Sequence, residues 1–207
     1  ETENELNIAR EQYGQTPTGY LESIGFLGPT VVAAHGVWVS EADIEILKRH
    51  GVGVSHNPES NMKLASGVAP VSRYLAAGVD LGLGTDGAAS NNDLDMFESM
   101  RFASLLHKLH ERDSRAVSAK ASLAMATIGG ARGIGLGDEV GSLEPGKRAD
   151  LVVVSMAAPR QTPLYDPVSH LVYTTRGDDV RMTIVHGRIL MRDGHVYSLD
   201  ETMILEE

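Results

Sequence analysis

Three short apolar runs, each followed by a polar residue and then by a helix-like segment, constrain the fold of this chain most. In chain order, the polar residues that follow the runs are His35, His56 and Asp86. Strands that alternate with helices predict a parallel sheet. Because the carboxyl ends of parallel strands meet at one edge, we expect these side chains to converge on one mouth, where barrel enzymes hold their chemistry. Two imidazoles and a carboxylate there favour a metal site or a proton-transfer site.

The spacing of apolar residues and the turn signals divide the rest of the chain. Helices are expected over residues 1–14, 17–24, 40–50, 71–77, 94–110 and 118–132. A long polar connection is expected over residues 57–67. Beyond Gly135 the chain turns to glycine-rich turns and short strand-like runs, expected at residues 149–154, 171–175, 180–186 and 189–191. His186-Gly187 and Asp193-Gly194 are hairpin turn signals.

The number of strand–helix repeats predicts an incomplete barrel. A closed eight-fold barrel needs about 250 residues, whereas only three repeats precede Gly135. We therefore expect an α/β fold with two parts. Residues 1–134 would form the C-terminal half of a (β/α)8 TIM-type barrel, and residues 135–207 a small β-sandwich portion. The chain starts at Glu1 in a helix-like pattern, which we interpret as a fragment with sequence missing upstream.

Composition and charge exclude several classes of function. The formal net charge is −10 and lysine and arginine form no cluster, which argues against binding nucleic acid or an anionic membrane surface. The chain has no cysteine, so a disulfide framework and a cysteine-ligated zinc site are both impossible. No apolar run approaches the roughly 18 residues of a membrane span, and no signal peptide is visible. These features predict a cytoplasmic protein.

Several motifs together are more specific than any one of them. They are Ala34-His35-Gly36, Ser55-His56-Asn57-Pro58, Ser60-Asn61-Met62-Lys63-Leu64 with Ser66-Gly67, the run from Gly84 to Asn92, residues 127–131 and residues 141–151. On these motifs the chain resembles the metal-dependent amidohydrolase superfamily in its deaminase branch. Within that branch it is most similar to 5-methylthioadenosine/S-adenosylhomocysteine deaminases, over essentially its whole length.

The resemblance implies catalytic and substrate-binding roles for four residues. Asp86 matches an aspartate that binds the metal and takes a proton from the attacking water. Glu1 aligns with a glutamate that carries a proton to the ring nitrogen of the substrate, so both carboxylates would also contact substrate. His35 matches a histidine that hydrogen-bonds the metal-bound water, and His56 matches a position that lines the pocket. The implied cofactor is Zn2+, although Fe2+ or Mn2+ can fill such sites.

The chain departs from the family pattern in its histidine ligands. The nearest match to the expected His-x-His pair is His107-Lys108-Leu109-His110, which has the wrong spacing and lies in a predicted helix. The remaining histidine ligands would therefore lie upstream of this chain. Asp86 alone would not hold zinc tightly, because zinc sites take three or four protein ligands. We expect this chain alone to be neither catalytic nor a strong metal binder, and to associate with a missing N-terminal half or as a homo-oligomer through unpaired strand edges.

The function implied for the intact protein is the hydrolytic deamination of adenine nucleosides to inosine analogues plus ammonia. Its small-molecule substrates would include 5′-methylthioadenosine and S-adenosylhomocysteine. One alternative is another heterocycle amidohydrolase, such as a guanine deaminase or a chlorohydrolase, and a substrate panel would separate these. A second alternative is a truncated, non-catalytic domain, which a metal assay would test.

Overall fold

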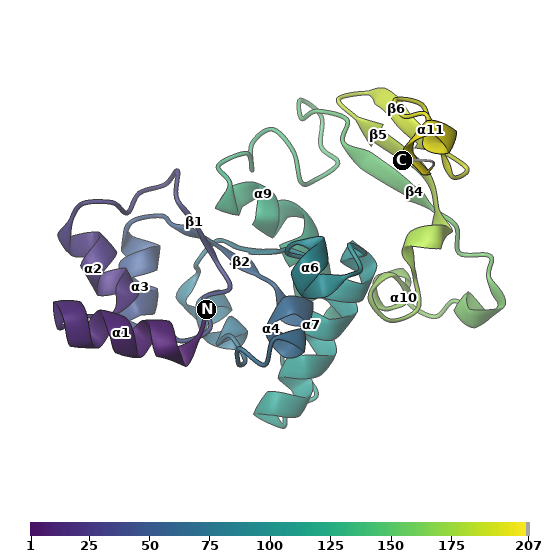
Figure 1. Cartoon of the computed structure of the whole chain (residues 1–207). Coiled ribbons are helices and arrows are strands. Elements are labelled where there is room, and N and C mark those ends of the chain that lie inside the picture. The colour runs from purple at the N-terminus through teal and green to yellow at the C-terminus, as the bar shows by residue number, and fades with distance from the viewer. Residues whose placement is uncertain (206–207) are drawn as a thin grey trace.

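The computed structural model describes residues 1–205 and contains a parallel and an antiparallel sheet, which lie apart (Figure 1). The parallel sheet has the order β1-β2-β3, and the antiparallel sheet the order β4-β5-β6-β7. The strands are β1 (Val32–Ala34), β2 (Gly53–His56), β3 (Leu81–Leu83), β4 (Leu151–Val154), β5 (Val180–Val185), β6 (Arg188–Arg192) and β7 (His195–Val196). The structure therefore confirms that the first three strands are parallel neighbours in sequence order.

Helices precede and follow the parallel strands and also join the two sheets. They are α1 (Glu3–Tyr13), α2 (Pro17–Ser23), α3 (Glu41–Arg49), α4 (Pro58–Lys63), α5 (Val71–Ala77), α6 (Ala88–Asn91), α7 (Met96–Glu111), α8 (Ala119–Ala124), η1 (Met125–Gly129), α9 (Gly130–Gly133), η2 (Pro159–Gln161), α10 (Pro167–Tyr173), η3 (Gly177–Asp179) and α11 (Glu201–Leu205). The predicted capping box of α3 is present: the Ser40 hydroxyl accepts from Asp43, whose side chain accepts from the Ser40 backbone.

The hydrophobic core lies around the parallel sheet. Val52, Val54 and Leu81 are almost fully buried, and Ile44 of α3 and Tyr74 of α5 pack into the same cluster. Each such side chain stabilises the fold by about 1.5–3 kcal/mol relative to an exposed one. This core holds the strands rigid, so the residues that follow them project from a fixed base.

Two glycines allow the helical segment η1–α9 to lie directly on the parallel sheet. A Cβ atom on Gly53 would stand 2.0 Å from the Gly133 carbonyl oxygen, and one on Gly82 would stand 2.8 Å from the Gly130 Cα. Any side chain at these positions would force the backbones apart. The small-residue stretch that ends the predicted helix over residues 118–132 therefore has a packing role.

Two predictions from the sequence are wrong in detail. Residues 57–67 do not form a plain loop, because Pro58 starts helix α4, most of which is buried. Residues 171–175 do not form a strand, because Asp166 caps helix α10 and Pro167 occupies its first turn. In both segments the proline in the first turn is a helix-start signal that the expected loop and strand did not take into account.

The predicted hairpin turns are confirmed. His186 and Gly187 have φ angles of 50° and 75°, and Asp193 and Gly194 have φ angles of 48° and 84°. Paired positive φ angles match the twist of two-residue hairpin turns. They join β5 to β6 and β6 to β7 as antiparallel neighbours.

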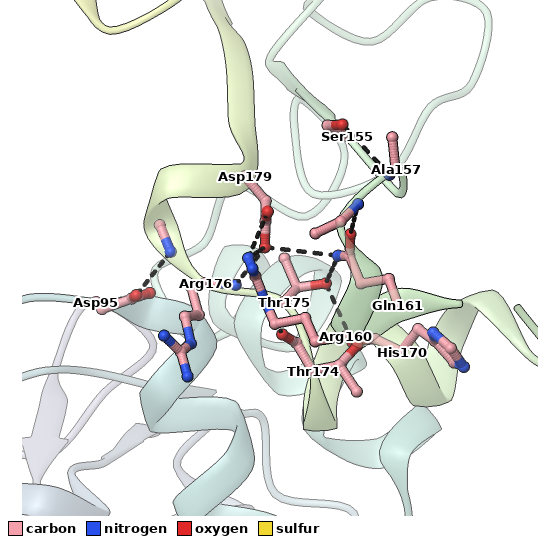
Figure 2. A network of polar contacts seen from close by, with 12 residues as sticks. Asp95, Ser155, Ala157, Arg160, Gln161, His170, Thr174, Thr175, Arg176 and Asp179 are labelled. Carbon is pink, nitrogen blue, oxygen red and sulfur yellow. Dashed lines mark hydrogen bonds and ion pairs between the residues drawn. The ribbon is translucent and has the colours of Figure 1, made fainter. Parts of the chain in front are cut away.

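A polar network fixes the connection between α10 and β5 (Figure 2). The Nη2 atom of Arg160 donates to both carboxylate oxygens of Asp179, at 2.6 and 2.5 Å, and the Arg176 backbone donates to the same carboxylate at 3.0 Å. Gln161, which is fully buried, donates to Thr175 at 3.3 Å. We call these residues, Arg160, Gln161, Thr175, Arg176 and Asp179, the junction network.

Candidate active site

The fold brings together three of the four residues that the sequence nominated. Glu1 precedes α1, His35 follows β1 and Asp86 follows β3. The Nε2 atom of His35 lies 3.5 Å from Glu1 Oε2 and 4.0 Å from Asp86 Oδ2. Their side chains are 23 %, 13 % and 32 % exposed for Glu1, His35 and Asp86, so all three remain open to a small molecule.

The backbone at two of these positions is strained. His35 has a φ angle of 67° and Asp86 a φ angle of 62°, in the left-handed region that glycine prefers. Such conformations cost on the order of 1–3 kcal/mol and cluster at active sites and ligand clamps. Here they turn the chain as it leaves β1 and β3, at the carboxyl edge of the sheet.

Two serine hydroxyls hold the Asp86 carboxylate. Ser60 and Ser90 each donate to Oδ2 at 2.7 Å. These bonds, first from Ser90 and then from Ser60, together with a backbone bond from Gly87, hold the pKa of Asp86 below its usual range. Asp86 is therefore ionised near neutral pH and able to bind a cation or accept a proton.

A third serine holds the Glu1 carboxylate. The Ser66 hydroxyl donates to Glu1 Oε1 at 2.5 Å, while Oε2 is the oxygen that faces His35. Ser66 is buried and lies just beyond α4. One oxygen of Glu1 is thus anchored and the other faces the site.

The Nδ1 atom of His35 contacts a buried amide. Asn61 Oδ1 lies 2.8 Å away, and the side chain of Asn57 lies at 3.4 Å. No local secondary-structure pattern in the sequence predicts these contacts or the roles of the three serine hydroxyls. The sequence signal that could have identified these contacts is the Ser60–Gly67 run, because this motif is more specific than a simple connecting loop requires.

His56, the fourth nominated residue, lies in the core. It has no exposed surface, and its Nε2 lies 3.1 Å from Nε2 of His107 in α7. Burial, reinforced by the neighbouring His107, lowers the pKa of His56 to about 3, and burial lowers the pKa of His107 to about 4. The His56 side chain therefore has no exposed surface through which it could contact a substrate directly.

Helix α6, which carries Ser90, is held in place by hydrogen bonds to α4, which is bonded in turn to α7. Asn91 donates to buried Glu59 at 3.0 Å and to the Thr85 backbone at 2.8 Å, and Ser99 of α7 donates to Glu59 at 2.5 Å. Burial raises the pKa of Glu59. Lys63 adds a bond to the Ala89 carbonyl oxygen at 2.9 Å, which connects α4 to α6.

The donor set of this chain does not by itself fit a zinc site. Within residues 1–205, no group of three histidine, aspartate or glutamate residues is arranged to hold a metal ion. A carboxylate such as Asp86 can supply one ligand, whereas zinc in proteins takes three or four.

Within residues 1–205, none of the helices has the length and apolarity to cross a membrane.

This fold and site define a class of protein. Residues 1–190 match the family model described as Amidohydrolase family, and the chain belongs to that family.

Among curated relatives, the chain is 54 % identical over 207 residues to a 5′-deoxyadenosine deaminase of Methanosarcina mazei, covering 100 % of this chain and 48 % of the relative. It is 48 % identical over 206 residues to a 5-methylthioadenosine/S-adenosylhomocysteine deaminase of Syntrophobacter fumaroxidans, covering 100 % of this chain and 47 % of the relative. The crystal structure of an adenosine deaminase from Xanthomonas campestris with bound zinc superposes with a TM-score of 0.96 at 39 % identity, covering 100 % of this chain and 47 % of that one. The chain thus spans about half the length of the relatives it matches.

Proposed function

We propose that the intact protein to which this chain contributes catalyses the hydrolytic deamination of adenine nucleosides, giving the inosine analogue and ammonia. The observation that carries the proposal is the convergence of two carboxylates on one imidazole nitrogen. Glu1 and Asp86 both lie within 4.0 Å of His35 Nε2. The relatives named as deaminases of 5′-deoxyadenosine and 5-methylthioadenosine/S-adenosylhomocysteine support this substrate class.

Deamination requires a proton to leave the attacking water and protons to reach the ring and the leaving amine. We assign the first task to Asp86, which its hydroxyl donors keep ionised. Glu1 would carry a proton to the ring nitrogen through its Oε2 oxygen. His35 lies between them and would hydrogen-bond the attacking water through Nε2. His56 would support the site from the core.

The metal in this proposal is zinc, with Fe2+ or Mn2+ as alternatives. Asp86 would supply one carboxylate ligand, and histidines outside this chain would supply the rest. Zinc lowers the pKa of a bound water toward about 7, which makes hydroxide available at neutral pH. The zinc-bound adenosine deaminase that superposes on this chain supports the assignment.

We further propose the architecture of the intact protein. Residues 1–134 would be the C-terminal half of a (β/α)8 barrel, and residues 135–207 part of a β-sandwich. Strand β1 is an edge of its sheet, and a cavity of about 240 Å3 lies beside it. Phe26, Val32 and Trp38 line this cavity and are 58 %, 46 % and 39 % exposed. We assign this edge to the N-terminal half of the barrel.

The decisive experiment compares this chain with the intact protein that also contains the N-terminal half. Ammonia release would be measured with 5′-deoxyadenosine, 5′-methylthioadenosine, S-adenosylhomocysteine, guanine and a chloro-triazine, and metal content would be measured in parallel. We expect the intact protein to carry about one metal ion and to prefer the adenine nucleosides. The chain alone should show neither property. Preference for guanine or the triazine would contradict the proposal, and so would an intact protein that is inactive with metal bound.

A further inference from the structure

One short segment holds every member of the candidate active site. The residues that follow Pro58 supply a separate contact to each of the three side chains, through positions 60, 61 and 66. The pairs are Ser60 with Asp86, Asn61 with His35, and Ser66 with Glu1. The serines bind carboxylates, for which any hydroxyl donor would serve. Asn61 binds an imidazole, and that contact also determines where the ring carries its proton.

The contact between Asn61 and His35 is buried and short. Asn61 is 1 % exposed, and its Oδ1 lies 2.8 Å from His35 Nδ1. An amide oxygen only accepts hydrogen bonds, so Nδ1 must carry the proton. In the neutral ring the other nitrogen, Nε2, then presents a lone pair to the mouth of the site.

Asn57 adds a second acceptor on the same side of the ring. Its amide satisfies its neighbours when the nitrogen donates to Ser55 Oγ at 3.0 Å and to the backbone oxygens of His56 and Gly84, each at 3.3 Å. In that orientation the amide oxygen takes the position 3.4 Å from His35 Nδ1. Two amide oxygens then face Nδ1, which strengthens the preference for a proton there.

The mouth of the site favours the opposite arrangement. Glu1 Oε2 and Asp86 Oδ2 lie 3.5 and 4.0 Å from His35 Nε2, and carboxylates attract a proton to that nitrogen. A neutral ring with its proton on Nε2 would donate to the carboxylates and could not accept a hydrogen bond from water. The buried amides and the exposed carboxylates therefore compete for the position of one proton.

We propose that Asn61 is a positioning residue that keeps His35 protonated on Nδ1, so that Nε2 accepts a hydrogen bond from the attacking water. This inference deepens the proposed function and rests on it. It assigns to the Ser60–Gly67 run a role in orienting the site, through a side chain that is almost fully buried and so offers little surface to a substrate. Mutation of residues that hydrogen-bond to metal-ligating histidines typically lowers metal affinity or activity 10- to 100-fold, and we expect an effect of similar size for Asn61.

The first test measures the tautomer directly. Long-range 1H–15N correlation spectra of the intact, zinc-loaded protein report which imidazole nitrogen of His35 carries hydrogen, and the His35→Gln variant assigns the signals. We expect hydrogen on Nδ1 and none on Nε2. A proton on Nε2, whether alone or together with one on Nδ1, leaves no lone pair there for the water and would overturn the proposal.

Isosteric variants supply the second test. Asn61→Leu removes the acceptor at nearly constant volume, and we expect kcat to fall about 10- to 100-fold with little change in KM. The spectrum should show the proton moved to Nε2. Asn61→Asp keeps an acceptor oxygen and should restore both the Nδ1-protonated spectrum and most of the lost kcat. Met62→Leu, on the same helix but 38 % exposed, is the matched control and should behave as wild type.

The outcomes separate this inference from the proposed function. A wild-type protein that binds metal but releases no ammonia from any nucleoside contradicts the proposed function, whatever the tautomer. A wild-type protein that is active while Asn61→Leu keeps both full kcat and the Nδ1-protonated ring contradicts only the role of Asn61. Thermal melting of each variant shows whether the substitution acts through the fold.

Discussion

The candidate active site and the junction network are both built from charged and hydroxyl side chains, yet they differ in how completely their polar atoms are used. In the junction network the Asp179 carboxylate is 7 % exposed and receives bonds from Arg160, Gln161 and Arg176. In the site, Asp86 is 32 % exposed and His35 Nε2 has no neighbour closer than 3.5 Å among its charged partners. Polar groups whose hydrogen bonds are all made within the protein stabilise the connection between two elements. Polar groups that are hydrogen-bonded on one side and exposed on the other can contact a small molecule.

The two regions also differ in backbone conformation. His35 and Asp86 have left-handed φ angles, whereas Arg160 and Asp179 lie in short 3-10 helices. Strain persists only where the surroundings hold it, and in the site Ser60 and Asn61 of α4 contact Asp86 and His35.

Removal of the Asp86 charge should have the largest effect. Asp86→Asn in the intact protein should lower kcat for the proposed nucleoside deamination about 10²- to 10⁴-fold, because the proposed proton acceptor and metal ligand would be lost together. Asp80→Asn is the control, since Asp80 is exposed and precedes β3 at the opposite end of the strand. Steady-state ammonia release measures the effect, and equal activity of the two variants would place the chemistry elsewhere.

Loss of the Asp179 carboxylate should affect stability and leave the chemistry intact. Asp179→Ala leaves Arg160 and Gln161 without their buried acceptor, and the free energy of unfolding should fall by about 2 kcal/mol. Asp178→Ala, an exposed neighbour in η3, should change it by less than about 0.5 kcal/mol. Denaturant titration measures both. If Asp179→Ala instead lowered kcat with stability unchanged, the contrast between the two networks would be wrong.

The buried pair of His56 and His107 should make the fold sensitive to acid. Their pKa values in the folded protein, about 3 and about 4, lie below the ordinary value of 6.5. Between pH 6.5 and 4 the unfolded chain therefore binds more protons than the folded one, so the free energy of unfolding falls as the pH falls. Above pH 6.5 these two groups contribute no slope.

Thermal melts between pH 7.5 and pH 5 test the histidine pair. The titratable groups near the pair are His35, whose charge acts on His56, His110, whose charge acts on His107, and Glu111, whose Oε1 is 3.8 Å from His107 Nδ1. His107→Gln should flatten the decline in melting temperature, because one of the two buried imidazoles is gone. A wild-type melting temperature independent of pH over this range would show that the pair is not buried and neutral.

The smallest effect should follow removal of one of the two hydroxyls on Asp86. Ser60→Ala leaves the Ser90 bond in place, so kcat/KM should fall less than about tenfold. The double variant Ser60→Ala/Ser90→Ala should lose more than the sum of the two single effects, since the carboxylate then has neither hydroxyl anchor. Strict additivity would indicate that the hydroxyls act independently of the orientation of Asp86.

Local rules predicted much of this molecule from the sequence. Apolar runs, the capping box at Ser40 and Asp43, and the Asp-Gly and His-Gly turns each depend on residues close together in the chain, and the structure confirms them. Helices α4 and α10 were missed, although a proline in the first turn of each is also a local helix-start signal.

By itself, the sequence determined the parallel strands and the polar residues that follow them, since both depend on spacing of a few residues. Only the tertiary structure decided which of those residues meet. It brought Glu1 to His35 and Asp86, and it turned His56 inward onto His107. The physical reason is that side-chain direction at a strand end depends on backbone φ angles and on partners tens of residues away, such as Asn61 and Ser66, whose contacts no local pattern encodes.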